Sequence, residues 1–298
     1  MQLIRHATRS PVYRHARWWI IGCLLALSLA ACRAAEPPGG DRAIVVPAVA
    51  VPTTTAPTTD RNAPTVTPDM APVRDSGWQP LFPGAEVRTY VADRAMTALR
   101  LAPAAVDFAV AYTTDPNAAR TVDGWLRNSS ALAAVNCGFY FTDEQQQNHA
   151  IGLLAGPEGV LSTLRPQWGG VLLVDDHKGW VQTAPAAQPG PVRLGVQGWP
   201  MLVRNRTPVS RLDATNPDAR TVVAQDDQGR IIFLVDIGGV SLASLAQFLL
   251  ASDMGIVHAV NLDGGSSTGL RYRSRADAPA AGYDSFWVPC ALLIRPAP

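Results

Sequence analysis

Two aspartates close two apolar segments near the C-terminus, and a glycine-serine bend follows the second. Asp236 ends the segment that begins at Arg230, and Asp263 ends the segment that begins at Val257. Two nearby carboxylates push each other's pKa values apart, which gives one proton donor and one ionised base or nucleophile. Backbone amides in a small, flexible bend can surround an anion. The pattern predicts an acid–base site for an anionic ligand, whose bend consists of Gly264, Gly265, Ser266 and Ser267.

The residues around Asp236 and Asp263 predict a strand, a helix and a second strand. Arg230–Asp236 is an apolar strand, Gly238–Gly239 is a turn, and Ser241 is typical of a helix N-cap. Leucines then recur at helical spacing until Gly255, and Val257–Asp263 is the second strand. A helical connection of this length predicts two parallel strands joined by a right-handed crossover.

This crossover would bring the two aspartates to the same edge of the sheet. Ligands of open α/β sheets bind at the carboxyl ends of the strands. If the strands are neighbours, they lie roughly 4.8 Å apart. The simpler alternative, that Asp236 only caps the turn before the helix, stays open.

The rest of the folded region is rich in short strands. Val106–Tyr112 and Ala131–Val135 are apolar strand segments, and Thr121–Ser129 has the spacing of a short amphipathic helix. Glycine-containing turns predict two hairpins, within 151–164 and 171–183. We therefore expect an α+β fold, with a mixed β-sheet core, a few helices and one C-terminal strand-helix-strand crossover.

The N-terminus predicts export and lipidation. Four arginines without any acidic residue precede an apolar run, Trp18–Ala31, which is shorter than a membrane-spanning helix and typical of a signal peptide. The run ends in Leu29-Ala30-Ala31-Cys32, which resembles a bacterial lipobox. We expect cleavage after residue 31, lipid attachment at Cys32 and a place in the bacterial cell envelope, on the outer membrane or in the periplasm of a Gram-negative cell.

Residues 32–76 are predicted to be a linker. Between Pro37 and Pro72 there are eight prolines, seven threonines and no aromatic residue, which favours an extended tether. Residues 77–298 then form one domain. Removing 1–31 changes the net charge from +1 to −3, since that segment holds four arginines and no acid. Such a charge predicts no nucleic-acid partner, and leaves the lipid anchor as the membrane contact.

Two cysteines, Cys137 and Cys290, remain in the predicted domain. An oxidising compartment allows them to form a disulfide. Two separate buried thiols are equally compatible with the sequence, which does not show whether the two residues meet.

Several segments resemble the phosphodiester glycosidase family, which includes the mannose 6-phosphate uncovering enzyme. Val260–Thr268 resembles the family signature around its Asp-Gly-Gly-Ser bend. Cys137 replaces a small residue in one of the other segments, and Trp199 replaces a glycine in another. The matches occur in family order over about residues 131–270. The further matching segments are Ala134–Tyr140, Gln197–Val203, Arg220–Ala224 and Gly239–Leu242.

The resemblance implies hydrolysis of a sugar-1-phosphodiester to free sugar and a phosphomonoester. Asp263 is then the expected base or nucleophile, Asp236 its partner, and Arg220 the bidentate partner of the phosphate. The remaining expected substrate contacts are Asn136, Gly138, Tyr140 and the Gly264–Ser267 bend. The expected partner is a glycosyl phosphodiester or a phosphate-containing polysaccharide of the envelope or of extracellular material.

Three other functions fit parts of the pattern. Gly265–Gly269 has the spacing of a serine-hydrolase elbow, but no helix pattern and no histidine follow it. No paired zinc motif is present, so we predict no metal or cofactor, although a divalent cation held by oxygen ligands near Asp236 and Asp263 stays open. A non-catalytic lipoprotein that binds polysaccharide or glycosyl phosphate would use the same residues.

Overall fold

Antiparallel β-sheets make up most of the part of the chain that the structure describes. In this computed structural model the described residues are 74–298, without 92–94, 177 and 188–191. The expected signal peptide, Cys32 and the linker up to residue 73 lie outside them. The domain was expected to begin at 77, but residues 74–75 already form a strand that pairs with Tyr90 and Val91.

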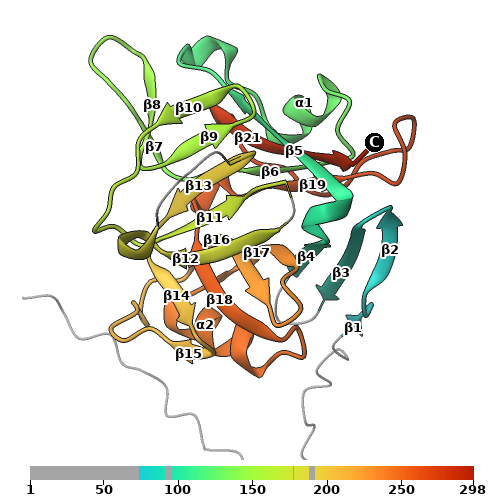
Figure 1. The fold of residues 1–298 in the computed structure, drawn as a ribbon, viewed down its shortest axis with the longest axis vertical. Helices are drawn as coiled ribbons and strands as arrows, with labels where there is room; N and C mark the ends of the chain where they lie inside the picture. Colours follow the sequence, from blue (N-terminus) through green and yellow to red (C-terminus); the bar gives the residue numbers. More distant parts are fainter. Residues whose placement is uncertain (1–73, 92–94, 177, 188–191) are drawn as a thin grey trace, which may run out of the picture. The chain divides into compact units, whose positions relative to one another are not determined.

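The largest sheet, called here the large sheet, has nine strands. Its order is β1-β3-β4-β17-β16-β18-β14-β15, and β2 also pairs with β3 (Figure 1). Its strands are β1 (Arg74–Asp75), β2 (Gln79–Phe82), β3 (Ala85–Val91), β4 (Ala95–Leu101), β14 (Met201–Arg204), β15 (Thr207–Pro208), β16 (Asp218–Asp226), β17 (Ile231–Val240) and β18 (Ile256–Asn261).

Two smaller five-stranded sheets and a hairpin complete the β structure. The β6 sheet, in the order β20-β19-β6-β21-β5, contains β5 (Val106–Tyr112), β6 (Ala133–Asn136), β19 (Leu270–Tyr272), β20 (Ala281–Tyr283) and β21 (Cys290–Pro296). The β11 sheet, in the order β10-β9-β13-β11-β12, contains β9 (Leu154–Gly156), β10 (Gly159–Ser162), β11 (Gly170–Val174), β12 (Gly179–Thr183) and β13 (Leu194–Gly198). The hairpin pairs β7 (Tyr140–Thr142) with β8 (Asn148–Ala150).

The main hydrophobic core lies where the three sheets meet. It takes Phe233 from the large sheet, Val135 and Leu292 from the β6 sheet, and Leu172 and Val196 from the β11 sheet. All five side chains are at most 1% exposed. The core therefore fixes the three sheets against one another, and it also fixes the loops at their ends.

Two α-helices are found in the described residues, and both confirm the sequence analysis. Helix α1 (Val122–Arg127) begins at Thr121, whose hydroxyl accepts a hydrogen bond from the Gly124 amide. Helix α2 (Leu242–Ala251) begins at Ser241, whose hydroxyl accepts one from the Ser244 amide. Figure 1 shows α1 against the β6 sheet and α2 against the large sheet. Neither helix is long and apolar enough to cross a bilayer.

The α2 crossover differs from the prediction in its neighbours. Strands β17 and β18 run in the same direction, as expected, because each is antiparallel to β16. However, β16 lies between them, so the two strands are not adjacent. Strand β17 also continues to Val240, so Gly238–Gly239 belongs to the strand rather than to a turn. The mixed sheet is not found in the described residues, where every strand pair is antiparallel, and the fold is dominated more strongly by sheet than expected.

Candidate active site

Asp263 lies two residues beyond the end of β18, on the bend that the sequence analysis identified. Burial raises the pKa of its carboxyl group above the ordinary value, and the negative charge of Asp218 raises it further. A hydrogen bond from the Ser267 hydroxyl and one from the Gly264 amide, at 3.0 Å, favour the ionised form and oppose this shift. A carboxylate with a raised pKa is a stronger base, which suits it to proton transfer near neutral pH.

The carboxylate nearest in effect to Asp263 was not identified from the sequence. Asp218 begins β16, and its carboxylate oxygens lie 3.3 and 3.6 Å from the position that a Cβ would occupy on Gly265. This residue precedes the predicted Arg220–Ala224 strand by two positions. Only the pairing of β16 with β18 brings it beside the bend.

Asp236 occupies a different position from the one expected. It is fully buried in β17, and its Oδ1 accepts a hydrogen bond from the Gly238 amide at 2.8 Å. It stands opposite Arg220 in the register of β16 and β17. Its charge contributes, after burial, to the raised pKa of Tyr283 in β20. Since β16 separates its strand from β18, the expected pairing of Asp236 with Asp263 is replaced by the pairing of Asp218 with Asp263.

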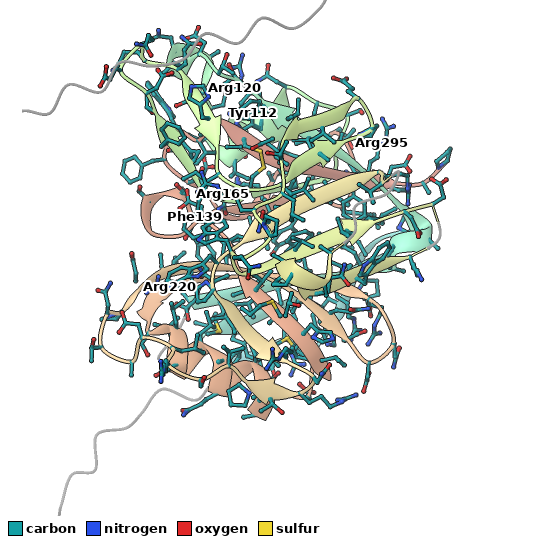
Figure 2. All side chains as sticks on the ribbon, turned by 60° about the vertical axis from the view of Figure 1, so that its left-hand side comes forward. Tyr112, Arg120, Phe139, Arg165, Arg220 and Arg295 are labelled. Carbon is teal, nitrogen blue, oxygen red and sulfur yellow. A yellow bond between two sulfur atoms is a disulfide. The ribbon has the colours of Figure 1, made fainter. Side chains whose placement is uncertain are left out.

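Arg220 borders the bend through its main chain. A Cβ on Gly264 would lie 2.7 Å from the Ala219 carbonyl oxygen and 3.8 Å from the Arg220 Cα, so glycine is required there. The guanidinium donates hydrogen bonds to the carbonyl oxygens of Asn216, at 2.8 Å, and Val240, at 3.1 Å. Figure 2 shows Arg220 on the left-hand side of that view, below Phe139 and Arg165. The guanidinium is therefore held in place by main-chain groups.

Asn136 joins the bend to the β6 sheet. Its side-chain oxygen accepts hydrogen bonds from the Thr221 hydroxyl at 2.8 Å and from the Gly269 amide at 3.1 Å. Its side-chain nitrogen donates to the Asp263 carbonyl at 2.8 Å. The residue is 1% exposed, so its amide is committed to protein groups. We had expected it to contact substrate, but this geometry gives it the role of positioning Asp263.

Two further buried carboxamides hold the neighbouring loops. The Gln197 side chain accepts hydrogen bonds from the Leu153 and Arg165 amides, and donates to the Arg165 and Trp168 carbonyls. The Asn261 side chain donates to the Trp199 carbonyl at 2.9 Å, next to the cis peptide bond between Trp199 and Pro200. None of these contacts was predicted. A polar residue inside an apolar segment was the available signal, because buried polar groups need hydrogen-bond partners.

Four of the predicted site residues line one pocket of about 150 Å³. They are Asp263, Asn136, Gly138 and Tyr140, and the two cysteines also line it. Gly138 has no room for a side chain, because a Cβ there would lie 2.3 Å from the Gln197 carbonyl oxygen.

The two cysteines form a disulfide. Cys137 and Cys290 are bonded, with their Cα atoms 5.6 Å apart. This bond decides between the two arrangements that the sequence left open. It ties the end of β6, next to Asn136, to the start of β21, and so fixes one wall of the pocket covalently.

The bend itself is a short 3₁₀ turn, Gly265–Ser267. Gly265 has a positive φ of 58°, which favours glycine. Ser267 is buried against Asp263, whereas Ser266 is exposed. Strand β19, not a helix, follows the turn, so the strand-turn-helix context of a serine-hydrolase elbow is absent at this position. Within the described residues, no three His, Cys, Asp or Glu side chains gather as a metal site would require.

Comparison with known proteins identifies the family. The chain belongs to the phosphodiester glycosidase family, whose model matches residues 129–295. Among solved structures, the catalytic domain of zebrafish N-acetylglucosamine-1-phosphodiester α-N-acetylglucosaminidase, auto-inhibited by its pro-peptide, has a TM-score of 0.52 and 16% identity, and covers 75% of this chain and 87% of that one. A hypothetical protein from Synechocystis has a TM-score of 0.55 and 15% identity over 76% of this chain and 64% of that one. No curated protein matches the sequence. The structural likeness shows the fold, and the family match confirms the resemblance found in the sequence.

The hydrogen bonds of Asn136 lead to a first prediction. Asn136→Ala leaves the buried Thr221 hydroxyl, Gly269 amide and Asp263 carbonyl without this partner. Each unsatisfied group costs about 1–3 kcal/mol, so we expect the free energy of unfolding in urea to fall by roughly 3 kcal/mol or more. Thr221→Val removes one of these bonds at similar volume and is expected to cost about 1–2 kcal/mol. A smaller loss for Asn136→Ala than for Thr221→Val would contradict the role of Asn136.

The raised pKa of Asp263 leads to a second prediction. Its contribution to stability is fully present below its unfolded pKa, near 3.8, and is lost as the pH rises through the folded value. Asp263→Asn cannot ionise, so its free energy of unfolding should exceed that of wild type at pH values where Asp263 is charged, and the gap should close towards pH 4. Urea unfolding between pH 4 and 9 measures the gap. Glu158→Gln, in an exposed turn, is the control for loss of one charge, and an equal gap in both variants would argue against burial as the cause.

Proposed function

We propose that this chain hydrolyses a sugar-1-phosphodiester and releases free sugar and a phosphomonoester. Its family consists of phosphodiester glycosidases. The observation that carries the proposal is the Asp263 carboxyl group, which has a raised pKa and lines a pocket together with Gly138 and Tyr140. These residues supply a proton acceptor and a surface for the sugar beside it.

In the proposed reaction, Asp263 accepts a proton from the attacking water. The water oxygen forms a new bond to the anomeric carbon or to phosphorus, and the bond between that atom and the bridging oxygen breaks. For attack at carbon, the phosphomonoester leaves as an anion with the bonding electron pair and needs no acid. For attack at phosphorus, the sugar oxygen leaves and takes up a proton. Ser267 and Gly264 stabilise the Asp263 carboxylate before the proton is transferred.

Arg220 and the bend are the proposed binding groups for the phosphodiester anion. The Asn216 and Val240 carbonyls hold the guanidinium beside the bend, and an arginine in a fixed position loses little entropy when it binds an anion. Tyr140 would pack on the sugar. Asp236, which faces Arg220 in register, is assigned the role of setting the position of that arginine.

The substrate is proposed to be a glycan of the cell envelope or of extracellular material. The name of the zebrafish structural neighbour specifies N-acetylglucosamine-1-phosphodiesters, and these compounds are therefore the first to test. The lipid anchor at Cys32 would hold the enzyme at a membrane, and the linker would separate the domain from the surface.

The activity is tested by incubating the purified protein with a series of sugar-1-phosphodiesters. Free sugar and phosphomonoester are measured separately, with and without EDTA. We expect turnover by wild type and a loss of at least 1,000-fold in Asp263→Asn, with a native circular dichroism spectrum. Water labelled with ¹⁸O places the label in the sugar for attack at carbon and in the phosphate for attack at phosphorus. Wild-type turnover in Asp263→Asn would refute the role of this residue, and tight binding without product would favour the non-catalytic alternative.

The lipid anchor is tested separately. A bacterial host that expresses the chain and is fed radiolabelled palmitate should label wild type but not Cys32→Ala. The unlabelled variant should move from the membrane fraction to the soluble fraction, because its anchoring group is missing. Retention of both the label and the membrane location in Cys32→Ala would show that this cysteine is not the site.

A further inference from the structure

Two neighbouring aromatic side chains stand out on the surface of the protein. Phe286 is 75% exposed and Trp287 is 72% exposed, the highest values among the large exposed hydrophobic side chains of the described residues. Burying one such side chain is worth roughly 1.5–3 kcal/mol. Exposure of two in sequence is therefore costly, and it marks a surface that contacts another molecule.

The loop that carries them is anchored on both sides. The Ser285 hydroxyl accepts a hydrogen bond from the Val122 amide, and the Asp284 carboxylate accepts one from the Asp123 amide. The Val288 amide donates to the Arg120 carbonyl at 2.8 Å. The main chain on both sides of Phe286 and Trp287 is therefore fixed, and the two rings are presented to solvent without being able to fold inward.

The same loop is joined directly to the candidate active site. The Phe286 amide donates a hydrogen bond to the carbonyl of Ser266, in the bend that follows Asp263, at 2.9 Å. Val288 and Pro289, which follow the two aromatics, line the pocket that also contains Asp263. The aromatic pair thus lies at the rim of this pocket.

The surroundings of the pair favour a neutral ligand with both apolar and hydroxyl groups. Asp284, Asp218 and the Ser266 hydroxyl are exposed around it. The two carboxylates would repel an anionic membrane surface, whereas carboxylates and hydroxyls bind sugar hydroxyl groups. A pyranose ring has C–H groups on its faces, which pack on aromatic rings, and hydroxyls around its edge.

We propose that Phe286 and Trp287 form a platform for a second sugar ring, on the far side of the phosphate from the sugar that is released. This inference rests on the proposed function and narrows its substrate class to diesters that link two sugars, as in a phosphate-containing glycan chain. The platform binds the part of the substrate that leaves with the phosphate, while Asp263 acts at the bond that breaks.

The test compares two diesters of N-acetylglucosamine 1-phosphate. One carries a methyl group on the phosphate, and the other carries a methyl glucoside joined through its 6-oxygen. We expect wild type to prefer the two-sugar diester in kcat/KM by about 10-fold or more, and Phe286→Ala/Trp287→Ala to lose this preference, mainly through KM. Trp287→Phe should retain most of it. Melting temperature should be nearly constant, because both side chains are exposed.

Trp199→Ala is the matched comparison. Trp199 is 49% exposed and lines a separate groove with Arg204 and Asn205. A double variant at 286 and 287 that keeps the full two-sugar preference overturns the proposal, and so does loss of the preference in Trp199→Ala alone.

Two further arms separate this inference from the proposed function. If wild type hydrolyses neither diester, the proposed function fails, and calorimetric binding of the two diesters to wild type and to the double variant still tests the platform. Equal binding by both proteins then overturns it. The second arm uses Cys32→Ala, without the lipid anchor, and vesicles of phosphatidylcholine and phosphatidylglycerol. Vesicle binding that requires Phe286 and Trp287, with an unchanged sugar preference, would assign the pair to a membrane and refute the platform.

Discussion

The buried carboxamide of Asn136 connects the parts of the candidate active site. It bonds to Thr221 in the large sheet, to Gly269 before β19 and to the main chain of Asp263. These three segments come from distant parts of the sequence, and the hydrophobic core alone would set their distance only approximately. A hydrogen bond in a buried setting has a narrow range of length and angle, so it fixes their relative positions. Gln197 and Asn261 do the same for the loops next to them.

The position of Asp263 reflects a compromise between stability and reactivity. Burial raises the pKa of its carboxyl group, so the ionised form costs free energy in the folded protein. The Ser267 hydroxyl and the Gly264 amide recover part of that cost. Removing these donors would make the carboxyl group easier to protonate, and exposing it to water would make it a weaker base. The bend thus holds the carboxyl group between these two limits.

The sequence predicts the elements well but not the contacts between them. Periodicity and capping residues identify α2, both hairpins and the strands that carry Asp236 and Asp263, because these signals are local. The insertion of β16 between β17 and β18 depends on which strands pair over long distances, and no local pattern encodes it. For this reason Asp236 was expected beside Asp263, whereas Asp218 occupies that place. The direct bonds of Asn136 also required the structure, although a polar residue in an apolar strand indicated that it would be satisfied internally.

The last strand of the chain has a consequence for how the protein is made. Strand β21 ends at Pro296, yet it lies inside its sheet between β6 and β5, and the disulfide ties its first residue to Cys137 across a separation of 153 residues. The pocket wall is therefore incomplete until the ribosome has released nearly the whole polypeptide. A precursor that cannot close its sheet early stays unfolded during synthesis, which is the state that a secretion channel accepts. The order of the strands thus couples the assembly of the active site to the completion of translation.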